Sequence, residues 1–482
     1  MMQYTKISMH HNVALILCGW LVASLCFAMS EEKEIELGKA EHQKIISQYG
    51  VYRNKELTDY VNRVGQRVAA QSARPELEYT FTVLDDEMIN AFALPGGFIY
   101  VTRGILTHLN SEAELAAVLG HEIAHVTEKH AIRNQNRGKV LGALSTVAAI
   151  FTGTPGLYEL GNIFGGVLLT GYSREFELEA DQVGAQYMAK AGYSPDAMLK
   201  TIEILKNKDR IEIEQARLED RKPRVYHGFL STHPDNDTRY KEAIKESEKL
   251  VSETDQILGV DEFMEKLNGM TYGTPPQTGV VRGNTFFHPR LGIKLTFPDS
   301  WRIESAPKGI QAMSPKSDAA FAITTARFPR DADARTFISE GLGFDLREGR
   351  EMTIAGMPAF IGIAERAQSP YGPRPVRLAV VFDQRRRLAF ILTGAGQYDL
   401  TKVANDREFI ATIFSFDTMD KEDFRDARPP TIQIVRAEEG TTMEALAAES
   451  PITTYALEKL RVMNGLYPYG QPEPGSLIKI VD

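Results

Sequence analysis

The spacing of apolar residues predicts that the chain is mainly helical from residue 31 to about residue 270. One stripe recurs at intervals of three and four positions, as on one face of an amphipathic helix. It consists of Leu57, Tyr60, Val61, Val64 and Val68. Two short runs, Tyr79–Leu84 and Phe98–Val101, instead have the composition of strands. We therefore expect residues 29–270 to form a mainly α domain with a small sheet.

The pattern changes at residues 271–284, a stretch rich in Gly, Pro and Thr that we interpret as a linker. Apolar and polar residues then alternate over residues 285–418, which predicts an α+β domain with helices around Ala334 and Lys402. A charged run separates a last module, residues 430–482, with a strand at its start and a helix near Thr441. The fold class is therefore multidomain, with two α+β parts after the helical one.

The first residues have the pattern of a secretory signal peptide, residues 1–28, with cleavage expected after Ala28. Its uncharged run, Val13 to Ala28, has 16 residues, fewer than the ~20 that span a bilayer. An uncleaved membrane anchor is the alternative. The two cysteines, Cys18 and Cys26, both lie in this segment, and each follows a leucine, which disfavours lipidation. A cleaved chain would therefore have no disulfide, no catalytic thiol and no Cys-type zinc site.

Composition narrows the class of protein further. The chain is 43% hydrophobic and 25% charged, as in ordinary globular proteins. Its formal net charge is −9, so it has no basic footprint for a nucleic-acid partner.

A zinc motif lies on the helix that begins after Ser111. Ser111 and Glu114 form a capping-box pattern, and the helix runs into the sequence His121-Glu122-Ile123-Ala124-His125. Two histidines four positions apart lie on one helical face, so both imidazoles reach one ion, and Glu122 is placed to act as general base. We expect one Zn²⁺ per chain.

A third ligand must come from His, Asp or Glu, and the acidic stretch from Glu175 to Asp181 offers candidates. Helical geometry puts Glu175 and Glu179 on a polar face that we expect to be solvated. Glu177 and Asp181 share the other face with Gly184, whose small size permits close approach to another helix. We therefore predict Glu177 as the ligand and Asp181 as the acceptor for the second N–H of a ligating histidine.

These residues resemble the gluzincin zinc metallopeptidases, the family that includes the CAAX prenyl protease, HtpX and the periplasmic BepA. The resemblance covers roughly Glu34 to Leu250. Its motifs are Asn90–Val101, His121–His125, Glu177 with Asp181, and Thr232-His233-Pro234. It implies a zincin-type domain in which His121, His125 and Glu177 bind zinc and Glu122 is the general base.

His233 has two interpretations. Near the metal it would occupy the open position or stabilise an oxyanion, and otherwise it is a helix-start residue packed by Pro234. His108, His130, His227 and His288 lack partners at ligand spacing, so we interpret them as ordinary surface or core residues.

On the substrate side, the strand Phe98–Val101 is either an edge that pairs with an extended peptide or a strand whose ladder is filled internally. The stretch Val140–Ser173 carries a single charge, Glu159. We expect its helices to pack over the cleft, to contact a membrane surface or to belong to the core.

The two later parts also resemble known domains. Residues 285–418 faintly resemble Mog1/PsbP-type domains, and residues 430–482 resemble a LysM-like module. The latter resemblance implies peptidoglycan attachment, and the alternative is a module that only packs.

Together these features predict an exported, periplasmic or envelope-associated zinc endopeptidase that acts on polypeptides. The resemblance adds a role in envelope protein quality control, with misfolded proteins as substrates. The alternative is a chaperone-like or peptidoglycan-associated binding factor with a latent zinc site.

Overall fold

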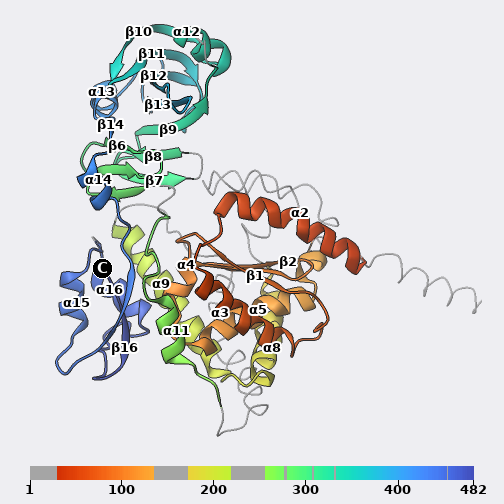
Figure 1. Ribbon diagram of the computed structural model, residues 1–482. Helices are drawn as coiled ribbons and strands as arrows, with labels where there is room; N and C mark the ends of the chain where they lie inside the picture. The colour runs from red at the N-terminus through yellow and green to blue at the C-terminus, as the bar shows by residue number, and fades with distance from the viewer. Residues whose placement is uncertain are drawn as a thin grey trace, which may run out of the picture.

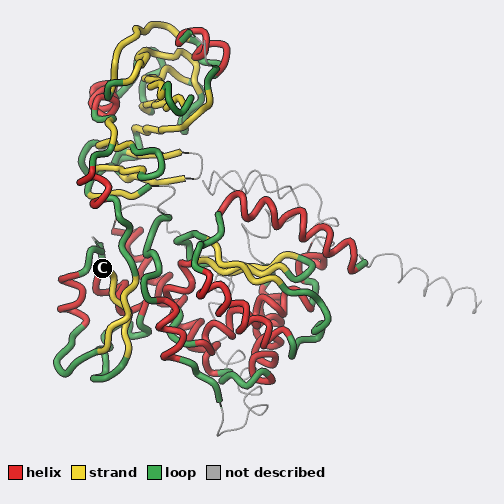
Figure 2. Tube along the Cα trace, viewed as in Figure 1, coloured by secondary structure: helices red, strands yellow, loops and turns green. Residues whose placement is uncertain are grey.

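The computed structural model describes residues 30–134, 172–218, 256–275, 279–306, 309–329, 333–452 and 454–482. A helical body with a small sheet is joined to a separate β-rich domain (Figure 1, Figure 2). The predicted signal peptide lies outside the described residues, as does most of the apolar stretch after Val140. Among the helices that the structure describes, none is both long and apolar enough to cross a membrane.

The helical body surrounds a three-stranded sheet of order β1-β3-β2, with β3 parallel to β1 and antiparallel to β2. The strands are β1 (Thr80–Leu84), β2 (Ala91–Leu94) and β3 (Phe98–Thr102). The helices are α2 (Glu31–Tyr49), α3 (Lys55–Ala69), α4 (Arg103–His108), α5 (Glu112–Thr127), α8 (Arg174–Lys190), α9 (Asp196–Leu218) and α11 (Val260–Leu267).

Strand β3 is covered on both faces. Ile99 and Val101 point into the cluster that includes α3 and α5, and Phe98 and Tyr100 point into the cluster beneath α2. Figure 1 shows the same layers, with α2 on one side of the sheet and α3 and α5 on the other. Because β1 and β2 flank β3, its ladder is filled internally, which is the second of the two expected arrangements. The edge strand on this side is β2.

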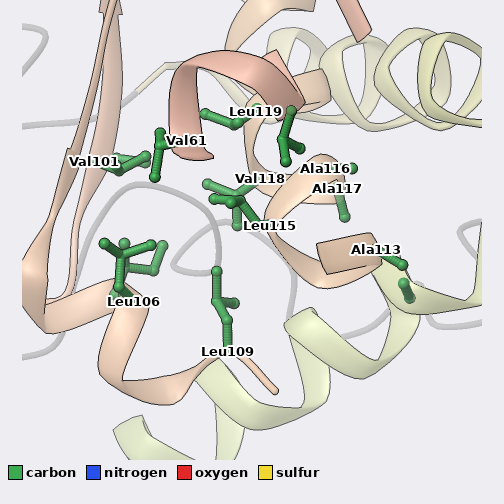
Figure 3. Packing of buried hydrophobic residues seen from close by; sticks show 14 of the residues in the cluster. Val61, Val101, Leu106, Leu109, Ala113, Leu115, Ala116, Ala117, Val118 and Leu119 are labelled. Atoms are coloured by element: carbon green, nitrogen blue, oxygen red, sulfur yellow. The ribbon is translucent and has the colours of Figure 1, made fainter. Parts of the chain in front are cut away.

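Helix α5 runs through the centre of the core. Its residues Ala113 and Leu115–Leu119 are fully buried. They meet Val61 of α3, Val101 of β3, Leu106 of α4 and Leu109 just after α4 (Figure 3). The expected capping contact is present, because Ser111 Oγ accepts from the Glu114 amide at 3.1 Å. The Glu114 carboxylate accepts from the Asn110 amide at 2.7 Å, whereas in a capping box it would accept from the amide of Ser111.

The β-rich domain contains a seven-stranded sheet of order β10-β11-β12-β13-β9-β8-β7 and a four-stranded sheet of order β14-β6-β5-β4. Both faces of the larger sheet are buried, since Ala379 and Val381 point into one cluster and Leu378 and Val380 into another. The strands of the two sheets of this domain are β4 (Val280–Arg282), β5 (Thr285–His288), β6 (Ile293–Thr296), β7 (Arg302–Ala306), β8 (Gly309–Met313), β9 (Ala319–Arg327), β10 (Leu346–Ile354), β11 (Met357–Ala367), β12 (Arg374–Asp383), β13 (Leu388–Gly396) and β14 (Asp417–Thr418). Its helices are α12 (Ala334–Thr336), the π-helix η3 (Phe337–Gly341), α13 (Asp406–Phe414) and α14 (Lys421–Asp426).

The last segment returns to the helical body. It has the order β15 (Ile432–Arg436), α15 (Met443–Glu449), α16 (Ala456–Met463) and β16 (Leu477–Val481), with the two strands paired antiparallel. Five of its buried apolar residues belong to the same cluster as those of α3 and α5, namely Ile432, Met443, Leu460, Met463 and Val481.

The two connections to the β-rich domain lie side by side. Thr271 and Thr431 form an antiparallel bridge, and the Tyr272 amide donates to the Pro430 carbonyl at 2.8 Å. The β-rich domain is therefore inserted between two adjacent points of the helical body.

Candidate metal centre

Helix α5 brings the two motif histidines to one point. The Nε2 atoms of His121 and His125 are 3.0 Å apart, and their side chains are 2% and 4% exposed. The cap at Ser111 and the buried apolar residues before His121 hold this helix in the core, so the imidazoles are fixed on a rigid element.

Helix α8 supplies the carboxylates, and a glycine contact decides how closely it approaches. A Cβ at Gly184 would lie 2.7 Å from the His121 amide nitrogen and 2.8 Å from the Gly120 carbonyl carbon. Only glycine therefore fits at this crossing. Close approach puts Glu177 Oε2 at 3.4 Å from His121 Nε2 and Glu177 Oε1 at 3.8 Å from His125 Nε2.

Asp181, one turn after Glu177, lies against the first histidine. Its Oδ1 is 2.7 Å from His121 Nδ1, and both side chains are buried. When Nδ1–H of His121 donates to this carboxylate, the lone pair of the neutral imidazole lies on Nε2, toward His125 and Glu177.

The donor set fits a zinc ion. His121, His125 and Glu177 each offer a ligand atom, and these atoms all lie within 4.8 Å of one another. Glu177 Oε2 is buried and accepts no hydrogen bond from any residue that the structure describes. Burial raises the pKa of Glu177 and lowers that of His125 well below its usual value. Two imidazole nitrogens and a carboxylate that converge in this way match the ligands of a catalytic Zn²⁺.

Glu122 lies next to these ligands on α5 and is 5% exposed. Burial raises its pKa to about 7, although the neighbouring His121 lowers it in part. A carboxylate with a pKa near neutrality can take up and release a proton during a reaction.

His130 and Glu179 make contacts at the metal centre that the sequence pattern does not predict. His130 is fully buried, with its Nδ1 at 2.7 Å from His125 Nδ1 and its Nε2 at 3.0 Å from Glu179 Oε2. His130 is thus a core histidine, one of the two expected alternatives, but its contact with His125 was not foreseen. Glu179 is only half exposed, and it also accepts from Arg133 at 2.8 Å. The one sequence feature that could have indicated this contact is that His130 follows His125 by five positions.

Tyr172 is a second residue that the sequence did not single out. Its ring stacks on His125 with centroids 4.2 Å apart. It also lines a small cavity of about 10 Å³ with Ala93, Leu94 and His125. The edge strand β2 and the metal centre therefore share one hollow. His233 and the rest of its motif lie outside the described residues, so its expected role stays a prediction.

A buried His-Glu-x-x-His helix with a glutamate from a second helix defines the class of zinc metallopeptidases. Residues 55–247 match the family model described as peptidase family M48. This part of the chain therefore matches a family of zinc metallopeptidases, in agreement with the resemblance expected from the sequence.

Two relatives illustrate the match. The beta-barrel assembly-enhancing protease of Escherichia coli (strain K12) is 28% identical over 224 residues, which cover 45% of this chain and 44% of the relative. The mitochondrial metalloendopeptidase OMA1 of Schizosaccharomyces pombe is 30% identical over 216 residues, which cover 44% of this chain and 60% of the relative. The chain thus spans less than half the length of the bacterial relative.

Proposed function

We propose that this protein is an exported zinc-dependent endopeptidase. The observation that carries the proposal is the convergence of His121, His125 and Glu177 within 4.8 Å in a buried site beside Glu122. When bound there, Zn²⁺ would supply a Lewis acid that polarises the scissile carbonyl and makes water more acidic.

The protein's own groups have separate tasks in this proposal. Glu122 takes a proton from the attacking water and delivers it to the leaving amine nitrogen, for which its pKa of about 7 is suited. Asp181 orients His121 through the 2.7 Å contact with Nδ1. An extended substrate would lie along β2, whose residues line the same cavity as His125.

Substitution of the proposed base tests the assignment. Glu122→Gln should bind zinc as the unmodified chain does and lose at least about a hundredfold in peptide hydrolysis, within the range expected for a general base. Zinc content and chelator-sensitive casein cleavage measure the two effects. Glu175→Gln, at an exposed position of α8, is the matched control and should keep full activity. Full activity of Glu122→Gln would contradict the proposal, and zinc-independent binding of unfolded proteins would favour a chaperone-like factor.

The cellular role is the more distant part of the proposal. We infer envelope protein quality control on misfolded polypeptides, supported by the name of the Escherichia coli relative, which refers to beta-barrel assembly. Capture of substrates by Glu122→Gln in cells tests it, and recovery of cytoplasmic proteins alone would contradict it. Cell fractionation and N-terminal sequencing test export, which predicts a mature chain that begins after Ala28.

Peptidoglycan contact through residues 430–482 is also proposed. The order strand, helix, helix, strand supports a LysM-like module. A cavity of about 320 Å³ between α9 and α16 is lined by the polar residues Asn110, Asn207, Asn464 and Tyr467. Co-sedimentation of the full chain with purified sacculi measures binding, and a chain that stays in the supernatant would contradict this contact.

A further inference from the structure

The second imidazole nitrogen of His125 does not face a carboxylate directly, unlike that of His121. It faces another imidazole, with His125 Nδ1 and His130 Nδ1 at 2.7 Å. The far nitrogen of His130 then lies 3.0 Å from Glu179 Oε2. A continuous chain therefore runs from the metal centre through two imidazoles to a half-exposed carboxylate.

If His125 ligates a metal, the position of each proton in this series of hydrogen bonds is determined. A neutral imidazole that ligates through Nε2 carries its proton on Nδ1. His125 Nδ1–H must then donate to His130 Nδ1, which leaves the His130 proton on Nε2, where it donates to Glu179. The opposite order would put the His125 proton on Nε2 and prevent ligation.

Several features fix His130 in this orientation. Helix α5 ends at Thr127, and Lys129 has a left-handed backbone with φ 54°, which reverses the chain so that His130 returns beneath His125. The His130 ring stacks on Phe176 with centroids 4.5 Å apart and an interplanar angle of 17°. Arg133 holds the Glu179 carboxylate from its other side at 2.8 Å.

We propose that His130 is a positioning residue for the metal centre, which holds His125 in its ligating tautomer and is itself held in place by Glu179. The inference rests on the proposed zinc site. In that site, the two histidine ligands would be held by different kinds of group. A carboxylate contacts His121 directly, whereas a histidine intervenes between His125 and its carboxylate.

Zinc affinity of the purified full chain, measured by competition with a chelator, tests this role without an activity assay. His130→Phe keeps an aromatic ring against Phe176 and removes the acceptor, so zinc binding should weaken about tenfold to a hundredfold, the range for lost outer-shell partners. His130→Asn restores an acceptor near the position of Nδ1 and should recover most of this loss. Glu179→Ala, at a half-exposed position, should weaken binding by less than tenfold.

Gln182→Ala is the matched control, because its position on α8 is exposed and lies outside this chain of contacts, so zinc affinity should not change. Circular dichroism of the metal-free variants verifies the fold. Zinc affinity of folded His130→Phe equal to that of the unmodified chain would overturn the inference, as would equal losses in the Phe and Asn variants. Failure of the unmodified chain to bind zinc would instead contradict the proposed function.

Discussion

Two buried charged side chains in the helical body, Glu112 and Arg103, are paired with partners that are distant in the sequence. The Glu112 carboxylate accepts from the hydroxyls of Tyr60 and Tyr193 at 2.6 Å each. Arg103 donates to Asp85 and to the Thr271 carbonyl, also at 2.6 Å each. Each contact satisfies a group whose burial would otherwise cost free energy. Loss of one partner should therefore destabilise this body more than loss of an exposed ion pair.

His108 should make the protein sensitive to acid. Its Nδ1 lies 2.8 Å from the Gly104 carbonyl, and burial lowers its pKa to about 3. The unfolded chain, with a histidine pKa near 6.5, binds a proton below that pH that the folded chain does not bind. Stability is therefore complete above about pH 6.5 and declines as the pH falls, by about 2 kcal/mol at pH 5.

Urea unfolding between pH 8 and pH 5 measures this decline. His108→Asn keeps a donor for Gly104 and removes the titrating group, so its stability should fall less steeply with acid. An equally steep decline in the variant would show that other groups cause it.

At the residue scale, the sequence predicts which side chains lie together when they belong to one helix, because helical periodicity alone determines their shared face. His121 and His125 share a face because they are four positions apart, and the same argument selects Glu177 and Asp181. The contact of His130 with His125 depends on the left-handed turn at Lys129 and on α8 beneath it. Neither follows from local periodicity.

Elements in this protein are positioned by glycines as much as by apolar side chains. Helices α5 and α8 cross at Gly120 and Gly184, where the backbones are in direct contact. Glu177 and Asp181 lie on the part of α8 that precedes this contact. The distance between the two helices therefore determines the distance between the carboxylates and the histidines.

Gly184→Ala should separate these helices. Alanine favours helices over glycine by up to about 1 kcal/mol, but its Cβ would lie 2.7 Å from the His121 amide nitrogen. We expect net destabilisation of about 1–3 kcal/mol, as for overpacked cores, together with weaker zinc binding. Thermal unfolding and chelator competition measure the two effects.

Gln182→Ala is the control for this substitution, because its position on α8 is exposed. It should change neither the stability nor the zinc affinity. A Gly184→Ala chain with unaltered zinc affinity would show that the crossing does not position the carboxylates.

The sequence also predicts the type of several elements, including the strand Phe98–Val101 and the helix at Ala334, whereas the helix expected around Lys402 begins at Asp406 and α14 was not foreseen. The position of β3 between β1 and β2 could not be predicted. Strand order depends on contacts between segments that lie apart in the chain, and the alternation of Phe98, Ile99, Tyr100 and Val101 is apolar on both faces.

The whole molecule has at least two separate hydrophobic cores. One of them contains segments from both before and after the β-rich domain. Residues from α3, α5, α16 and β16 share one core, whereas the β-rich domain between them has its own. Lys479 of β16 is fully buried, and its Nζ donates to the Thr107 and Leu109 carbonyls at 2.9 and 2.6 Å. The last segment thus helps to hold α5, the helix that carries His121 and His125, in place.

Two matched core substitutions should separate these units. Leu460→Ala and Leu392→Ala remove equal side chains at fully buried positions in different cores, each at a cost of about 2–5 kcal/mol. Leu460→Ala should lower the unfolding transition that zinc stabilises, and Leu392→Ala should lower the other. Calorimetry with and without chelator measures both. A zinc-sensitive transition that is unaffected by Leu460→Ala would contradict a shared core.

The sequence indicates where the β-rich domain begins and ends, because the composition changes near residues 271 and 430. It does not indicate that the chain returns to its first core after the β-rich domain. The bridge between Thr271 and Thr431 and the burial of Ile432 are contacts across more than a hundred residues of chain.

The shared core has a consequence for biosynthesis. A ribosome releases α5 early, but the strands and helices that complete its surroundings, residues 432–481, are made only after the entire β-rich domain. A nascent chain therefore carries the predicted zinc ligands of α5 before the residues that complete the surrounding core are made. The complete core around α5 therefore forms only in chains whose translation has passed the last strand.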